Sequence, residues 1–179
     1  AVGHPTSALT TWKGWTDAVS ATSPPLLVVI CHTAKRVRAG TPAVQFEIGR
    51  STGAKRQWLD VDEIASDYVI GPKGKPNPLV LLIGCSTAIP RVRFSNAVAQ
   101  LMNNEAAIVL STLSTILGEQ AALTTAALIE RLADMPPRRE TTFGDALLKV
   151  RREMVADDVL MALALVAFGD ADWRLARAP

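Results

Sequence analysis

Two histidines and two cysteines are the side chains of this sequence best suited to nucleophilic chemistry. Cys31 and His32 are adjacent, Cys85 lies 53 residues beyond His32, and His4 stands near the start. A cysteine attacks as its thiolate, and an imidazole is the natural base to form that thiolate near neutral pH. The sequence therefore predicts a Cys–His pair, with His32 as the base and Cys85 as the nucleophile.

His32 and Cys85 each come after a short apolar run. The runs Leu26–Ile30 and Leu79–Ile83 are too apolar for surface strands and too short for buried helices, which indicates buried strands. In parallel sheets, ligands bind beyond the carboxyl ends of the strands. Neighbouring strands lie about 5 Å apart, so adjacent strands here would bring the imidazole and the sulfur to one cleft.

The alternative to a catalytic role is that each of these residues lies in the core or at the surface without a function of its own. Cysteine is among the most buried residue types, so a lone cysteine at a strand end is more often core than catalytic. Cys31 faces the side of its strand opposite His32 and is expected in the core. His4 lies in a polar segment and is expected at the surface.

Helical patterns alternate with these strands along the chain. The sequence predicts an α/β fold, with a mostly parallel sheet covered by helices on both faces. The expected helices are Trp12–Val19, Asp60–Tyr68, Phe94–Met102, Gln120–Leu132 and Thr141–Val155, the last capped by Thr142. A β-hairpin is expected at Pro42–Gly49, and further strands at Ala106–Leu110 and Leu160–Phe168.

Length and composition exclude several classes of protein. The 179 residues indicate a single domain, 1–179, and 49% hydrophobic residues exclude a disordered chain. A net charge of +2, without aromatic residues interleaved in a basic stripe, does not indicate nucleic-acid binding. No uncharged apolar run approaches the roughly 18 residues of a membrane span, and no signal peptide is visible. We therefore expect a cytoplasmic protein with no membrane partner.

No motif of this sequence indicates a metal or a cofactor. It has no Cys/His cluster with zinc-ligand spacing, so no metal is expected. The glycines and lysines of Gly71–Lys75 precede a strand rather than follow one, and they do not form a phosphate-binding loop. A nucleotide-binding α/β module is therefore a weaker alternative.

Several blocks together resemble the CHAT domain of the caspase-like cysteine peptidases. The separation of 53 residues between His32 and Cys85 is close to the roughly 50 residues found in caspases. The matching blocks are Leu27–His32, the hairpin Pro42–Gly49, Leu79–Thr87, Phe143–Leu147 and Val166–Asp170. The resemblance implies a caspase-like three-layer sandwich, and it extends from about Trp12 to Leu175.

By this resemblance, the chain is a cysteine endopeptidase that needs no cofactor and cleaves a protein substrate, typically in bacterial signalling or defence. His32 matches the general base and Cys85 the nucleophile. The backbone amides of Thr33, where the family commonly has glycine, and of Cys85 are the oxyanion-hole candidates.

The substrate-binding candidates are residues near the nucleophile and one acidic side chain. They are Ile83, Gly84, Ser86 and Glu119. Relatives specific for basic side chains carry Asp two positions before the nucleophile. Ile83 occupies that position here, so the usual acidic anchor is missing.

The family fold begins with strands and helices that precede the element matching Trp12–Val19, and only about ten residues precede that element here. We therefore expect it to be the C-terminal portion of a larger protein or complex, in which other domains or chains supply N-terminal strands and regulation. An open sheet edge would otherwise invite association. The competing interpretation is a catalytically weak or inactive caspase-like module that acts in protein interaction or regulation; Thr33 and the missing elements favour it.

Overall fold

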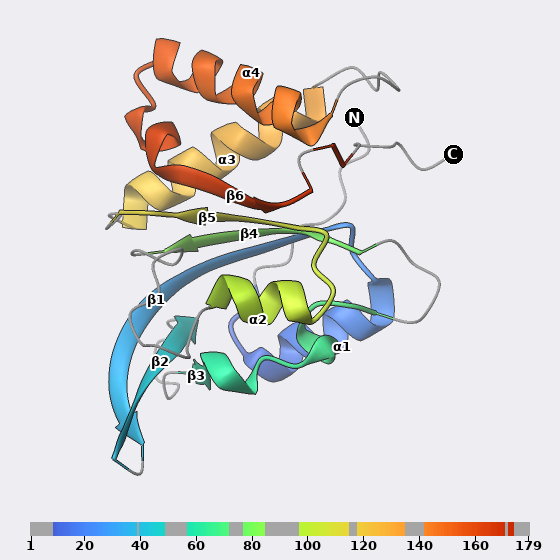
Figure 1. Ribbon diagram of the computed structural model, residues 1–179, viewed down its shortest axis with the longest axis vertical. Helices are drawn as coiled ribbons and strands as arrows, with labels where there is room; N and C mark the ends of the chain where they lie inside the picture. Colours follow the sequence, from blue (N-terminus) through green and yellow to red (C-terminus); the bar gives the residue numbers. More distant parts are fainter. Residues whose placement is uncertain are drawn as a thin grey trace.

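The strands that the structure describes form one six-stranded sheet with helices on both faces (Figure 1). The computed structural model describes residues 9–38, 40–48, 57–71, 77–84, 97–114, 118–134, 142–170 and 172–173. In the order β3-β2-β1-β4-β5-β6, the sheet contains β1 (Leu26–Arg38), β2 (Thr41–Ile48), β3 (Gln57–Asp60), β4 (Leu79–Gly84), β5 (Ile108–Thr112) and β6 (Leu165–Gly169). The prediction of an α/β fold is confirmed at this level.

The sheet is mixed, so the prediction of a mostly parallel sheet is wrong. Among the described strands, β1 pairs with β4 and β4 with β5 in parallel. The other three pairings, β1–β2, β2–β3 and β5–β6, are antiparallel. The segment predicted as a hairpin, Pro42–Gly49, supplies a single strand, β2, which pairs in antiparallel with both β1 and β3. Antiparallel neighbours of this kind need no crossover connection.

Helices cover both faces of the sheet, as predicted. The helices α1 (Trp12–Thr22) and α2 (Ala97–Asn103) enclose one apolar core against the sheet. The helices α3 (Gly118–Asp134) and α4 (Phe143–Ala156) enclose the other (Figure 1). Within the described part of the chain, no helix combines the length and apolar composition needed to cross a bilayer.

Side-chain caps set the starts of α1 and α4. The Thr11 hydroxyl accepts the Gly14 amide at 3.1 Å, and the predicted cap Thr142 accepts the Asp145 amide at 3.1 Å. Each bond satisfies a backbone donor that the first helical turn leaves unpaired. At the other end of α1, Ser23 adopts a left-handed conformation with φ 46°, and its amide donates to the Val19 carbonyl.

Two predicted elements differ from the structure. The segment expected as one helix, Asp60–Tyr68, instead forms two 3₁₀ turns, Val61–Glu63 and Ser66–Tyr68, because Ile64 is extended between them and buried in the core. The segment expected as one strand, Leu160–Phe168, begins with the 3₁₀ helix η3 (Leu160–Ala164). Only its second part becomes β6, where Leu165 first pairs with β5.

The strand β1 changes its pairing partner midway. Its residues Leu26–Cys31 pair with β4 in parallel, and its residues His32–Arg38 pair with β2 in antiparallel. Figure 1 shows this long strand curving away from β4 and toward β2. The expectation that the strand ends just before His32 is therefore wrong, because the hairpin supplies new hydrogen-bonding partners beyond that point.

The first half of β1 has a strand neighbour on one side. The sheet order puts β4 on one edge of β1 and β2 on the other, yet β2 begins its pairing only at His32. Within the described residues, the outer edge of Leu26–Ile30 therefore faces no strand. Such an edge can accept an additional strand.

Amide exchange tests this open edge. Successive amides of a strand point to opposite edges, so alternate amides of Leu26–Ile30 bond to β4. We expect the other amides of this segment to exchange more than about tenfold faster, measured by NMR on the chain alone. Uniformly slow exchange along the segment would show that another segment, or a second copy, already covers the edge.

Candidate functional site

His32 is the residue at which the pairing of β1 changes from β4 to β2. The last parallel pair of β1 and β4 joins Cys31 to Gly84, and the first antiparallel pair of β1 and β2 joins His32 to Glu47. The His32 side chain is exposed. The imidazole thus lies just beyond the carboxyl end of the parallel pairing, which is where α/β sheets bind ligands.

The end of β4 is held in place by the neighbouring strand. Gly84 is its last residue and is buried, and the hydroxyl of the fully buried Thr112 in β5 donates a hydrogen bond to its carbonyl oxygen. The predicted nucleophile Cys85 and the substrate candidate Ser86 come next in the sequence and lie outside the described residues.

The structure also describes three other predicted site residues, and each lies in a different environment: Thr33, Ile83 and Glu119. Thr33 is half-buried and pairs with Phe46, and its side chain shares the α1 face of β1 with the buried Cys31, opposite His32. Ile83 is fully buried in the core beneath α3 and α4, which speaks against contact between its side chain and a substrate. Glu119 is exposed in the first turn of α3.

The face of the sheet that carries His32 also carries buried polar side chains on β2 and β3. Gln45, Glu47 and Asp60 are only 7%, 9% and 8% exposed. Nε2 of Gln45 donates to Oδ1 of Asp60 at 2.5 Å. Sequence reasoning missed these residues because alternation of polar and apolar residues in a hairpin is usually taken to place the polar ones in water. The alternation of Gln45 and Glu47 with apolar neighbours was the available signal, but it does not show what lies opposite them.

A groove of about 370 Å³ opens near the end of the sheet where β5 finishes and β6 begins. It is lined from α3 by Gln120, Leu123 and Thr124, and from the other side by Asp158–Met161. The Leu113 amide, just past β5, donates to the Ala164 carbonyl at 2.9 Å and ties η3 to this edge. Leu123 and Leu160 are 69% and 61% exposed, so apolar side chains at the rim of the groove face the solvent.

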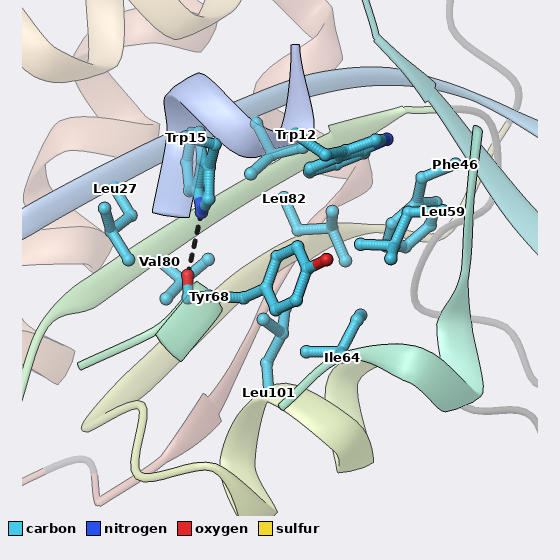
Figure 2. Close-up of a pocket in the computed structure, with 11 residues that line it drawn as sticks. Trp12, Trp15, Leu27, Phe46, Leu59, Ile64, Tyr68, Val80, Leu82 and Leu101 are labelled. Carbon is cyan, nitrogen blue, oxygen red and sulfur yellow. Dashed lines mark hydrogen bonds between the residues drawn. The ribbon is translucent and has the colours of Figure 1, made fainter. Parts of the chain in front are cut away.

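A small pocket beneath α1 is lined by side chains of the core (Figure 2). It measures about 20 Å³, enough for roughly one water molecule, and aromatic and aliphatic side chains line it. Nε1 of Trp15 donates to the Tyr68 carbonyl at 2.8 Å and fixes this helix over the sheet. Burial, and then the nearby carboxylates of Asp67 and Glu63, raise the pKa of Tyr68 above 10.0.

Tyr68 is the single tyrosine, so its titration can be followed directly by the absorbance of tyrosinate. We expect a midpoint above 10.0 in the folded protein and a value near 10.0 in concentrated urea. Because the folded state favours the neutral phenol, the free energy of unfolding falls as the pH rises above 10.0. Equal midpoints in the two states would contradict the burial of this ring.

Among the described residues, no three His, Cys, Asp or Glu side chains gather in a way that could hold a metal ion. Comparison with protein-family models finds no match, and comparison with curated proteins finds no significant relative. The likeness to the CHAT domain therefore stays a prediction, and the function must be inferred from the position of His32 and the end of β4.

Removing the hydroxyl that holds Gly84 tests how firmly the end of β4 is anchored. Thr112→Val keeps the shape of the side chain and deletes the donor to the Gly84 carbonyl, so we expect the free energy of unfolding to fall by about 1 kcal/mol or more. The matched control is Thr125→Val, whose hydroxyl donates at 2.7 Å to the Ala121 carbonyl within α3. That carbonyl also accepts a helix amide, so urea unfolding should show a smaller loss. An equal or smaller effect of Thr112→Val would contradict the anchoring.

Proposed function

We propose that this chain is a cysteine endopeptidase of the caspase-like type, in which His32 is the general base and Cys85 the nucleophile. The observation that carries the proposal is the pairing of Cys31 with Gly84 at the carboxyl end of two adjacent parallel strands. His32 is the next residue on one strand, and Cys85 is bonded to the last residue of the other. The finer assignment of the fold as a caspase-like sandwich belongs to this proposal.

The spacing of the strands supports a Cys–His pair. Paired strands lie about 4.8 Å apart, and the peptide bond ties Cys85 to Gly84. The imidazole is exposed on one side of this junction and Thr112 anchors the other. A catalytic pair of this kind requires its two groups within hydrogen-bond reach, with looser distances tolerated before a substrate binds.

The proposed reaction follows the usual course of thiol proteolysis. The His32 imidazole takes the proton of the Cys85 thiol, and the thiolate adds to the carbonyl carbon of the scissile peptide bond. Backbone amides, with those of Thr33 and Cys85 as the candidates, stabilise the resulting oxyanion. The C–N bond then breaks as the imidazolium protonates the leaving amine, and water hydrolyses the thioester with His32 again as the base.

The groove between α3 and η3 is our candidate for binding a substrate side chain. It lies at the same edge of the sheet as Gly84, and its exposed leucines favour an apolar side chain. Glu119, the acidic candidate from the sequence, adjoins the lining residue Gln120. An apolar preference also agrees with Ile83 standing where relatives specific for basic residues carry Asp.

Within the described part of the chain, the edge of Leu26–Ile30 that faces no strand supports a partner and also the second candidate function. A strand from another domain or chain, added along Leu26–Ile30, would extend the large sheet beside His32. Such a partner could regulate the peptidase. In a catalytically inactive module, the same edge would itself be the functional surface.

Labelling with a peptide bearing a thiol-reactive electrophile tests the peptidase proposal. We expect Cys85 to be modified far faster than Cys31, which is only 6% exposed and serves as an internal control. Replacing the base, as in His32→Ala, should slow labelling of Cys85 by about 100-fold or more, as is typical for general-base catalysis. Mass spectrometry of the digested protein locates the adduct.

His4→Ala is the matched control, because it removes the only other histidine of the chain. It should leave labelling unchanged, whereas Cys85→Ala should abolish both labelling and cleavage of a peptide library. The peptidase proposal fails if Cys85 reacts no faster than a free peptide thiol and no library peptide is cleaved. The interaction module would then be the better interpretation.

A further inference from the structure

Glu47 stands directly opposite His32 in the antiparallel pairing of β1 and β2. Residues paired in this way project from the same face of the sheet, with their Cβ atoms about 4.5–5.5 Å apart. The side chain of a glutamate is long enough to span this separation. Both residues lie within strands, which hold their positions more firmly than loops would.

The surroundings of Glu47 shield its carboxylate from water. Its other neighbour in the sheet is Trp58 of β3, which is paired with it directly and therefore shares its face. His32, Glu47 and Trp58 thus form a row across three adjacent strands, and Glu47 is only 9% exposed. Electrostatic interactions of a carboxylate with adjacent groups are stronger in such a site than in bulk water.

Few other charges share this face among the described residues. Asp60 lies diagonally from Glu47 and accepts the Gln45 amide. Arg36 follows His32 on the same face of β1, two side chains further along and exposed. Glu47 is therefore the carboxylate nearest to His32 by the register of the sheet.

An imidazole that acts as a base on a thiol is a better base when its second ring nitrogen is held by a hydrogen-bond partner. A carboxylate that accepts the N–H of this second nitrogen fixes the tautomer and the ring orientation, and it stabilises the imidazolium that forms when the thiol loses its proton. We propose that Glu47 is a positioning residue that holds the His32 imidazole by accepting its ring N–H. The catalytic part of this inference rests on the proposed peptidase function, whereas the contact itself does not.

The first experiment measures the tautomer of His32 and needs no activity. The ¹⁵N chemical shifts of the neutral imidazole report which ring nitrogen carries the proton, and His4→Ala assigns the two histidines of the chain. We expect the native protein to show one dominant tautomer at His32. Glu47→Gln, which is nearly isosteric, should give the mixture of an unconstrained imidazole, and Glu47→Asp should retain part of the native preference.

Glu63→Gln is the matched control, because Glu63 is exposed in a turn and its loss should leave the His32 signals unchanged. An identical His32 tautomer in the native protein and in Glu47→Gln would overturn the inference. Urea unfolding of each variant shows that the comparison is made on folded protein.

The second experiment measures the rate at which the peptide electrophile labels Cys85. Glu47→Gln should slow labelling by about 10- to 100-fold, as is usual for residues that orient a reacting group, and Glu47→Asp should restore part of the rate. An altered tautomer with an unchanged labelling rate would overturn the catalytic role of Glu47. If native Cys85 does not react but the tautomer still depends on Glu47, the peptidase proposal fails and the Glu47–His32 contact stands.

Discussion

The arrangement of this protein depends on one change of hydrogen-bonding partner within a single strand. The strand β1 pairs with β4 as far as Cys31 and with β2 from His32 onward. The strands β4 and β2 bond to opposite edges of β1, and the pairing with β4 ends at Cys31, one residue before the pairing with β2 begins. His32 stands at that limit, next to the end of β4.

The same change of partner leaves part of the β1 backbone without a strand neighbour on one side, within the described residues. Because β2 joins β1 only from His32, the residues Leu26–Ile30 have a sheet neighbour on one edge within the described part of the chain. Burial of the odd-numbered side chains under α1 and bonding to β4 stabilise this half-paired segment. Among the residues that the structure describes, this edge is therefore one that can accept a further strand, and such a strand would lie close to His32.

The hairpin differs from an ordinary solvent-facing ribbon. Residues 43–48 are buried throughout, including Gln45 and Glu47, although such side chains usually face water. Burying polar groups costs free energy unless they find partners, and the Gln45–Asp60 bond meets this requirement for one pair. These buried polar side chains share one face of the sheet with the exposed His32.

The sequence alone determined the elements with strong local signals. The apolar runs at Leu26 and Leu79 predicted strands, and the hydroxyl of Thr142 predicted the start of α4. The run at Leu79 is buried throughout, as predicted, whereas Leu26–Ile30 is buried on one face only, since Ile30 is 45% exposed. Alternation predicted the strand β2 and the buried side of Cys31. These features follow from neighbours in the chain. The length of β1, the antiparallel pairings and the position of Glu47 opposite His32 were decided by the tertiary structure. They could not be predicted because register depends on contacts between residues far apart in sequence, and a shift of one residue in a strand moves every side chain to the opposite face.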